Sequence, residues 1–324
     1  MGSAGTAQRK HMTTALILGV NGQDGTFLAR HLIRKGYKVV GIGRQETSRR
    51  DIESSLFRYH QADLSQREAL DATLHEFRPD LIFHVAAVHT SAGGQYEPIW
   101  DQSLKVNVAS VHSLLEYLRC VNPEGRLIYA SSAKVFGEPY PPLMDETTPI
   151  KNACLYSITK NAAFHLIRYY RDRHSIKGSV VYLFNHESEF RPSDYFIPKM
   201  LRCLAAARRD PAHVASVNTL DFYCDWGSAE EYMSLLIEMI ESAPAEDFVL
   251  GTGICTYAKD LVRNMFERYG LDCGRHLIEA NTPGKALNSP YIVDTRKLQR
   301  AIHRRPVRRI YDVCVEMLEK LGTT

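Results

Sequence analysis

The stretch that constrains the fold most is residues 13–45, in which three glycines spaced three apart follow a short apolar run. The run at 15–18 predicts a buried strand, and the segment after the glycines has apolar residues at helical spacing. Gly36 ends that predicted helix, and residues 38–42 predict a second strand. Strand, glycine turn, helix and strand in this order form the first half of a dinucleotide-binding fold.

The three glycines have the properties that binding a pyrophosphate requires. Gly19 allows the tight turn, Gly22 lets backbone N–H groups approach the phosphates, and Gly25 lets the helix pack closely on the strand. The N-terminus of the helix then stabilises the phosphate charge. An ordinary Gly-rich turn is the alternative, and the flanking strands and helix argue against it.

The end of the second strand discriminates between cofactors. An NAD site usually has an acidic residue there for the ribose 2′-OH, whereas this chain has Gly43 and Arg44, with no acid before Glu46. Arg44 can pair with a 2′-phosphate, so NADP(H) is favoured over NAD(H), although a solvated arginine is the alternative. The expected cofactor contacts are the glycine turn, later strand ends and two helical residues: Gly19, Gly22, Gln23, Asp24, Gly25, Arg44, Asp63, Leu64, Ala86, Ala87, Tyr156 and Lys160.

Strands and helices alternate through the first half of the chain. Apolar runs after the second strand predict further strands, and amphipathic segments between them predict helices. This alternation predicts an α/β fold, a doubly wound parallel Rossmann sheet covered on both faces. The predicted strands begin at 80, 126 and 178, and the predicted helices span 65–77, 101–121 and 156–173.

The regular alternation ends after residue 185, and the rest of the chain mixes loops with shorter elements. We expect a helix at 197–207, a short strand at 214–217 and a last helix from Val307. We also expect a smaller C-terminal lobe and a substrate cleft between the lobes. The predicted division is a leader at 1–12, a Rossmann domain at 13–184 to which 225–254 returns, and a substrate-binding lobe at 185–224 and 255–324.

A serine, a tyrosine and a lysine are expected to lie together at the carboxyl edge of the sheet. Ser132 ends a predicted strand, and Tyr156 and Lys160 lie on one face of the next helix. A phenol has a pKa of about 10, and a nearby ammonium lowers that pKa. The lysine can also hydrogen-bond the nicotinamide ribose, and the serine can hydrogen-bond the substrate oxygen. This set suits hydride transfer between NADP(H) and a carbinol or ketone.

Composition and charge exclude several classes of protein. With 324 residues, 44% hydrophobic and 24% charged, the chain can build a large core or two lobes. A net charge of +3 gives no electrostatic basis for binding nucleic acid. Without a long apolar run or a signal-peptide pattern, we expect a soluble cytoplasmic protein with no membrane partner. Seven scattered cysteines predict reduced thiols and no metal site.

The chain resembles the extended short-chain dehydrogenase/reductases that modify nucleotide sugars, and within them the GDP-mannose 4,6-dehydratases. The resemblance implies a nucleotide-sugar substrate, with Asn185 and Lys199 contacting its diphosphate and His186 ordering the loop between them. It covers residues 13 to about 320 and is carried by residues 19–25, 182–188, 220–227 and, more weakly, 293–298.

Several positions depart from the family pattern. Where the dehydratases have Thr-Ser-Glu, with the Glu removing the C5 proton, this chain has Ser132, Ala133 and Lys134. An ammonium ordinarily cannot abstract a proton at pH 7 unless it is strongly desolvated. Cys224 replaces an arginine, and residues 282–285 read Thr-Pro-Gly-Lys instead of the Arg-Pro-x-Glu motif that clamps the diphosphate and ribose.

Two phosphate-pairing arginines and one ribose-pairing acid are therefore missing. Either the nucleotide differs or the clamp is rebuilt, for which Lys134, Arg191 and Lys285 are the candidates. A solvated loop lysine is the alternative for Lys134. His89 takes the place of a serine that contacts the sugar in the family, and it is either an acid–base group or a structural histidine.

The leading hypothesis is an NADP-dependent enzyme that modifies a nucleotide-linked sugar, which the resemblance suggests is GDP-linked. Reduction of a 4-keto group needs only Ser132, Tyr156 and Lys160. Epimerisation also needs acid–base groups, for which Lys134 and His89 are the candidates. Dehydration with a substituted base and a non-enzymatic NADP-binding scaffold are the alternatives, and the intact Ser–Tyr–Lys set argues against the scaffold.

The resemblance also predicts how the chain assembles. Relatives commonly pair through two long helices, here 101–121 and 156–173, which implies a homodimer. The dehydratases form tetramers through an Arg/Ser-rich loop after the second strand. Residues 45–55 have lost much of that pattern, so a tetramer is possible but less favoured than the dimer.

Overall fold

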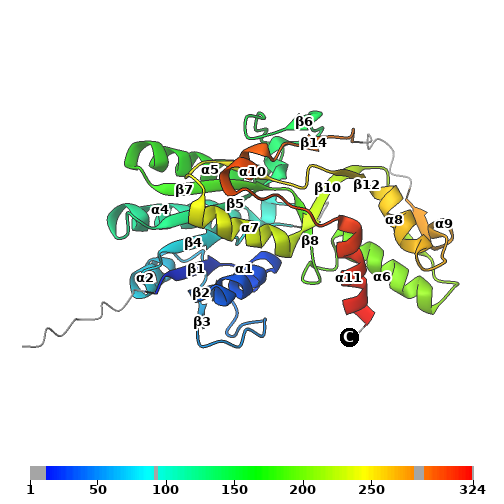
Figure 1. Cartoon of the computed structure of the whole chain (residues 1–324), viewed down its shortest axis with the longest axis horizontal. Helices are drawn as coiled ribbons and strands as arrows, with labels where there is room; N and C mark the ends of the chain where they lie inside the picture. Colours follow the sequence, from blue (N-terminus) through cyan, green and yellow to red (C-terminus); the bar gives the residue numbers. More distant parts are fainter. Residues whose placement is uncertain (1–11, 91–93, 281–287, 323–324) are drawn as a thin grey trace, which may run out of the picture.

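The computed structural model describes residues 12–90, 94–280 and 288–322. Its centre is a sheet of seven strands, all parallel, in the order β11-β7-β5-β4-β1-β2-β3 (Figure 1). The predicted doubly wound α/β fold is therefore confirmed. The strands are β1 (Thr14–Leu18), β2 (Lys38–Gly43), β3 (Phe57–Gln61), β4 (Leu81–His84), β5 (Arg126–Ser132), β7 (Lys177–Leu183) and β11 (Phe248–Leu250).

Strand order reverses beside β1, which pairs with β2 on one side and with β4 on the other. At the carboxyl end of β1, Leu18 is in register with both Ile42 and His84. Chains leaving neighbouring strands in opposite directions open a crevice at this point, and open α/β sheets bind ligands there.

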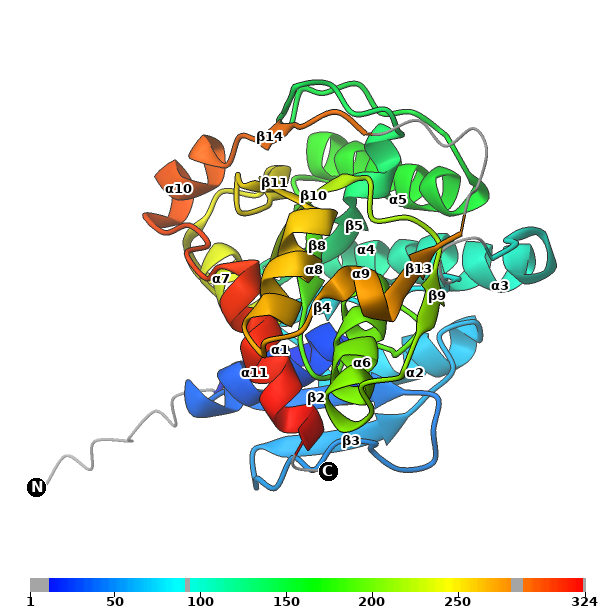
Figure 2. The same ribbon diagram turned by 90° about the vertical axis from the view of Figure 1, so that its right-hand side faces the viewer.

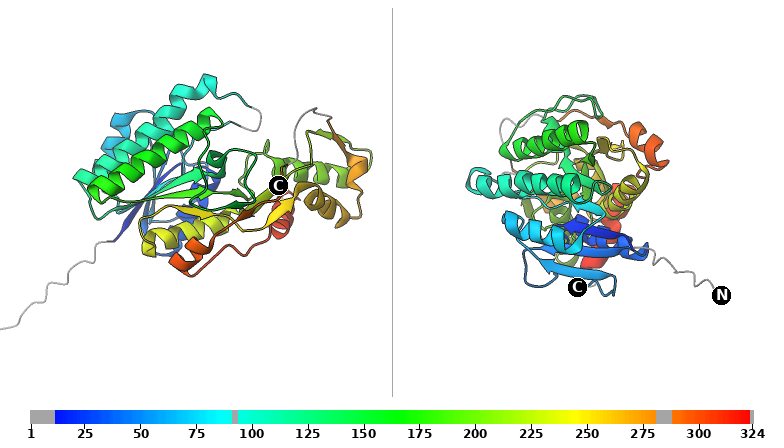
Figure 3. Two further views of the ribbon diagram at one scale, coloured as in Figure 1. Left: turned by 90° about the horizontal axis from the view of Figure 1, so that it is seen from above. Right: turned by 90° about the vertical axis from the view of Figure 1, so that its left-hand side faces the viewer.

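Helices cover both faces of the sheet (Figure 3). On one face α1 (Gln23–Arg34) packs on α7 (Ala229–Ser242), and on the other α4 (Ser110–Cys120) lies between α2 (Arg67–Phe77) and α5 (Leu155–His174). Each layer has its own cluster of buried apolar side chains against the sheet. Burial on both faces explains why these strands read as nearly continuous apolar runs in the sequence.

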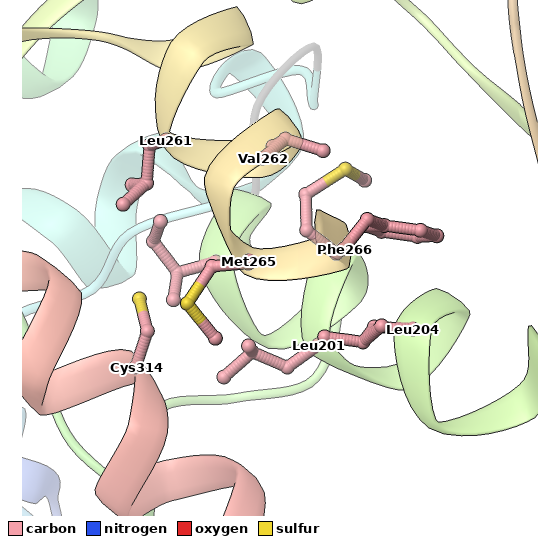
Figure 4. A pocket seen from close by; sticks show the side chains of 9 residues that line it. Leu201, Leu204, Leu261, Val262, Met265, Phe266 and Cys314 are labelled. Carbon is pink, nitrogen blue, oxygen red and sulfur yellow. The ribbon is translucent and has the colours of Figure 1, made fainter. Parts of the chain in front are cut away.

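A smaller lobe lies beyond the carboxyl ends of the strands (Figures 1 and 2). Its helices share a separate apolar cluster, in which Trp226 and Phe266 are buried. A void of about 10 Å³ within this cluster has only apolar side chains and Cys314 around it, so it is a packing gap rather than a ligand site (Figure 4). The helices are α6 (Phe196–Arg209), α8 (Ala258–Glu267), α9 (Cys273–His276) and α11 (Ile310–Gly322), and the strands are β8 (Asn185–Glu187), β9 (Ala215–Val217), β10 (Tyr223–Ser228), β12 (Cys255–Tyr257) and β13 (Leu277–Glu279).

The chain returns to the sheet between α9 and α11. Strand β14 (Ile292–Val293) pairs with β6 (Leu143–Met144), and α10 (Arg296–Ile302) packs on α7 and β11. Leu298 and Ile302 of α10 belong to the cluster on the α1–α7 face. Part of the segment 255–324 therefore passes over the sheet rather than through the smaller lobe.

Several elements differ from the sequence-based expectation, and three of the differences have a clear cause. Strand β3 was not predicted, because as an edge strand it is only half-buried and lacks an apolar run. The predicted helix 101–121 contains a π-helical segment, η2 (Lys105–Ala109), between α3 (Trp100–Leu104) and α4. The last helix begins at Ile310 rather than Val307, because the Glu231 carboxylate accepts the backbone N–H groups of residues 307 and 308.

Candidate active site

A groove of about 330 Å³ lies at the carboxyl ends of β1, β2 and β4. Its walls come from the glycine turn and from the residues that follow each strand. Val106 of η2 closes one side. Seven of the predicted cofactor contacts line this groove, namely Gly19, Gly22, Arg44, Asp63, Leu64, Ala86 and Ala87.

The glycine turn leaves no room for side chains. Gly19 has φ of +96°, and a Cβ there would lie 2.9 Å from the Ala86 backbone. A Cβ on Gly25 would lie 2.3 Å from the carbonyl oxygen of Gly19, so α1 starts directly beneath the turn. A narrow backbone cradle at the start of a helix fits the pyrophosphate of a dinucleotide.

Asn21 holds the loop after β2 against this turn. Its amide donates to Gln45 Oε1 at 2.6 Å, and its Oδ1 accepts from the Arg49 N–H at 3.1 Å. Arg44 and Arg49 are exposed and both line the groove. Sequence reasoning missed Asn21 and Arg49, although Asn21 lies within the glycine motif itself.

The side chains of Gln23 and Asp24 point to the smaller lobe. Asp24 Oδ1 lies 3.0 Å from His186 Nε2, and Gln23 Nε2 donates to the His186 carbonyl oxygen at 3.1 Å. The charge of His186 lowers the pKa of Asp24 despite its burial, and Asp24 raises the pKa of His186. This ion pair joins α1 to β8, so the His186 side chain contacts Asp24 and holds the two lobes together at this point.

Ser132, Tyr156 and Lys160 meet at the carboxyl end of β5. The Tyr156 hydroxyl lies close to Ser132, and Tyr156 and Lys160 are both buried. Lys160 Nζ donates to the Ala130 carbonyl oxygen at 2.7 Å and lies 5.7 Å from the centre of the Tyr156 ring. The structure thus brings the predicted triad together.

The expected effect of Lys160 on Tyr156 needs correction. Burial, with the neighbouring Tyr96 and Tyr195 hydroxyls, raises the pKa of Tyr156 instead of lowering it. Burial also lowers the pKa of Lys160 to about 7, so this ammonium supplies less charge than a solvated lysine would. Tyr156 is therefore a protonated phenol at neutral pH.

His89 lies against this triad. Its ring contacts Tyr156 edge-on, with the ring centres 4.5 Å apart. Its Nε2 is 3.2 Å from both Lys134 Nζ and the Tyr96 hydroxyl, and its Nδ1 is 3.5 Å from the Tyr195 hydroxyl. Burial and the charge of Lys134 lower the pKa of His89 to about 3. The predicted candidates His89 and Lys134 are thus hydrogen-bonded to each other, and His89 is neutral.

The predicted substrate contacts lie in the smaller lobe. Asn185 is exposed at the start of β8, and its amide donates to Cys224 Sγ at 2.9 Å. Lys199 is exposed on α6. Arg191 packs over the Tyr195 ring at 3.9 Å, and its Nε lies 3.7 Å from a carboxylate oxygen of the buried Glu187. Lys285 lies outside the described residues.

Comparison with known proteins identifies the group to which this site belongs. The protein family described as GDP-mannose 4,6 dehydratase matches residues 16–312. The chain belongs to this family. The GDP-mannose 4,6-dehydratase of Vibrio cholerae is 30% identical over 253 residues, which are 74% of this chain and 68% of that protein. The human enzyme is 27% identical over 289 residues, 83% of this chain and 76% of the relative.

Solved structures with low sequence identity share the fold of this GDP-mannose 4,6-dehydratase family member. A dTDP-glucose 4,6-dehydratase from Bacillus anthracis, in complex with NAD, has a TM-score of 0.81 at 15% identity and covers 96% of this chain and 97% of its own. A UDP-glucose 4-epimerase from Thermotoga maritima, with UDP-glucose, has a TM-score of 0.79 at 18% identity, with 96% and 99% covered.

The predicted resemblance to nucleotide-sugar-modifying extended short-chain dehydrogenase/reductases is thereby confirmed. The family comprises enzymes that act on nucleotide sugars with a nicotinamide cofactor. None of the helices in the described part of the chain combines the length and apolarity needed to cross a membrane.

Proposed function

We propose that this protein is an NADP-dependent reductase of a 4-keto sugar linked to GDP. The observation that carries the proposal is that Ser132, Tyr156 and Lys160 meet at the end of β5, where Lys134 takes the place of the dehydratase glutamate. A phenol whose pKa is raised by burial is a proton donor at neutral pH, which suits the reduction of a carbonyl. The reverse reaction would need a phenolate as the base.

In this reaction the residues of the chain bind the carbonyl and supply one proton. The Ser132 and Tyr156 hydroxyls hydrogen-bond the 4-keto oxygen, and Tyr156 transfers its proton to that oxygen as negative charge develops. Lys160 is hydrogen-bonded to the β5 backbone, where it can also donate to the cofactor ribose. A bound nicotinamide cofactor supplies the hydride. Burial of Tyr156 and Lys160 limits the access of water to the proton donor.

Lys134 argues against dehydration as the main reaction. The dehydratases have a glutamate at this position, and this chain has a lysine hydrogen-bonded to a neutral histidine. Dehydration with a substituted base remains the second candidate, because Lys134 occupies the position of the dehydratase glutamate. Epimerisation needs a similar proton transfer at carbon, from Lys134 or His89.

The loop after β2 supports the choice of NADP. Arg44 and Arg49 line the groove, and the acidic residue described among its lining, Asp63, follows β3 rather than β2. Two guanidinium groups can bind a 2′-phosphate through charge-assisted hydrogen bonds. In the lobe opposite, Asn185, Lys199 and Arg191 would contact the diphosphate, with Lys285 a further candidate. His186 would position that loop through Asp24.

We propose a homodimer in the cytoplasm as the working state. Apolar side chains are exposed on the two helices expected to pair, including Leu104 of α3 and Ile158 and Tyr169 of α5. Burying them between two copies would remove apolar surface from water. The seven cysteines are all free thiols, which suits a reducing compartment.

The test is to mix the protein with NADPH and a GDP-4-keto-6-deoxy sugar and to follow the absorbance of reduced nicotinamide. We expect continuing loss of NADPH, and loss of most of that activity in Tyr156→Phe. Formation of a 4-keto-6-deoxy product from GDP-mannose would instead establish the dehydratase alternative. A sugar that changes with no net loss of NADPH would establish an internal redox cycle.

A further inference from the structure

Lys134 places a positive charge beside the triad. It is the second residue of η3 (Ala133–Phe136), and its backbone N–H donates to Ser132 Oγ at 3.2 Å. Its Nζ lies 3.2 Å from His89 Nε2, and the same imidazole packs edge-on against Tyr156. The Lys134 side chain is exposed, so a bound sugar can reach the amine and the phenol from the two sides of one histidine ring.

The hydrogen bond to His89 favours the charged form of Lys134. Lysine is charged at neutral pH, and an ammonium can only donate hydrogen bonds. His89 Nε2 therefore accepts from Lys134, and the ring proton lies on Nδ1, which faces the Tyr195 hydroxyl at 3.5 Å. An acceptor beside the ammonium stabilises its charge, so Lys134 is a cation in this site.

The groups around Lys134 offer many hydrogen-bond donors and few acceptors. The Tyr96 hydroxyl also lies 3.2 Å from His89 Nε2, so one nitrogen lone pair is shared between two donors. A lysine ammonium has three N–H donors, and within the described ranges His89 Nε2 is the acceptor that Lys134 Nζ has. The Ser132 and Tyr156 hydroxyls are further donors nearby. Such surroundings match a ligand group that has several lone pairs and no hydrogen to donate.

The charge of Lys134 also lacks a counter-ion. In the part of the chain that the structure describes, no carboxylate lies at ion-pair distance from Lys134, whereas Arg191 has Glu187 at 3.7 Å. Glu138 acts on Lys134 only from farther away. Partial burial and the charge of Arg191 lower the pKa of Lys134, and a bound anion would offset both effects. The donors and the charge thus favour the same kind of ligand group, a small anion.

We propose that Lys134 binds a carboxylate carried by the sugar, so that the substrate is a nucleotide-linked uronic acid rather than a neutral hexose. The two oxygens of a carboxylate accept several hydrogen bonds and donate none, as the groups around Lys134 require. The keto oxygen binds to Ser132 and Tyr156, and the carboxylate binds to the amine on the other side of the His89 ring. The diphosphate is expected at the smaller lobe and does not need Lys134.

The same pairing would protect a keto acid during reduction. A carboxylate on the carbon beside a ketone can leave as CO2, because the electron pair of the broken C–C bond passes into the carbonyl to form an enolate. An ammonium paired with the carboxylate stabilises its negative charge, and this stabilisation is lost when neutral CO2 leaves. Lys134 would therefore favour reduction of the ketone over loss of the carboxylate.

This inference rests on the proposed function, which supplies the keto sugar, but binding tests it without the reaction. The experiment is to titrate the NADPH-bound protein with GDP-mannuronate, with GDP-mannose and with GDP, and to measure each dissociation constant by calorimetry. The first two ligands differ only in a carboxylate or a hydroxymethyl group on the sugar, and neither has a ketone that NADPH could reduce. GDP reports on the nucleotide and its diphosphate alone.

We expect the parent protein to bind GDP-mannuronate about tenfold more tightly than GDP-mannose, which is the contribution of one charge-assisted hydrogen bond. Lys134→Met should bind the two sugars equally, and Lys134→Arg should retain most of the preference because it keeps the charge. Lys151→Met, at an exposed lysine on a neighbouring loop, serves as the matched control and should keep the full preference.

Equal affinity of the parent for the two sugars, or a preference that persists in Lys134→Met, would overturn the inference. A loss of affinity in Lys134→Met that is as large for GDP as for GDP-mannuronate would also overturn it, since the ammonium would then bind the diphosphate. NADPH consumption with a saturating GDP-4-keto-6-deoxy sugar, measured on the same preparations, reports separately on the proposed function. Consumption without the preference would overturn only the acidic substrate, and the preference without consumption would support Lys134 as an anion site and overturn the reductase.

Discussion

Burying the charged Lys160 side chain lowers the stability of the folded protein, so replacing this lysine should raise the free energy of unfolding. The side chain is 2% exposed, and burial lowers its pKa from the ordinary 10.5 to about 7. Since one pH unit corresponds to about 1.4 kcal/mol, holding the ammonium in this site costs up to about 5 kcal/mol in the cofactor-free protein. Replacing it with methionine removes that cost and loses the hydrogen bond to the Ala130 carbonyl, worth about 1–3 kcal/mol.

The sign of the pH dependence follows from a pKa that is lower in the folded state than in the unfolded state. Below pH 7 the folded protein contains the buried ammonium, and the full cost is present. As the pH rises toward 10.5, the folded state is already neutral and the unfolded state loses its proton, so the cost disappears. The stability advantage of Lys160→Met should thus fall by about 4 kcal/mol between pH 6 and pH 10.

Urea unfolding of cofactor-free protein at these two pH values measures this difference. We expect Lys160→Met to be more stable than the parent by about 3 kcal/mol at pH 6, although it should lose enzymatic activity. Lys151→Met, at an exposed lysine, controls for the general effect of losing a charge. An advantage of Lys160→Met that is equal at both pH values would refute the reasoning.

Three further outcomes follow from the groove and its contact with the smaller lobe. Gly25→Ala places a Cβ 2.3 Å from the Gly19 carbonyl oxygen and should lower the melting temperature and abolish cofactor binding, as calorimetry would show; unchanged affinity would contradict the cradle. Asp24→Asn should lower the free energy of unfolding by about 2 kcal/mol at pH 6 and by less at pH 9, as urea unfolding would show. Asp24 raises the pKa of His186, so the stability that a charged His186 contributes is lost as the pH rises through the pKa of the folded state. Arg44→Ala should raise the KM for NADPH about tenfold and leave that for NADH nearly unchanged; equal effects would exclude a 2′-phosphate contact.

The fold and the cofactor groove were largely predictable because their signals are local. The glycine spacing, the apolar strands and the amphipathic helices each occupy a short stretch, and Arg44 follows β2 directly. Strand β3 was missed because its half-exposed residues lack a clear period. The role of Asn21 was missed because its partners lie on a loop more than twenty residues away.

The sequence predicts which residues form the triad but not how their surroundings shift their pKa values. Tyr156, Lys160 and Ser132 were recognised by spacing, yet the direction of the pKa shift depends on how deeply the phenol is buried. The ring of His89 contacts Tyr156 and Tyr195, which come from segments distant in sequence, besides Tyr96 of its own segment. No local pattern brings Tyr156 and Tyr195 to that ring.

The central claim is that hydride passes between the cofactor and C4 of the sugar while Tyr156 supplies the proton. The most direct test uses NADPH deuterated at the transferable position of the nicotinamide, with a GDP-4-keto-6-deoxy sugar, and locates the label by NMR. The account predicts one deuterium on C4 of a reduced sugar. With Tyr156→Phe it predicts very little labelled sugar, because most of the activity is lost. A changed sugar without label on C4, or label retained on the cofactor while the sugar changes, would contradict it.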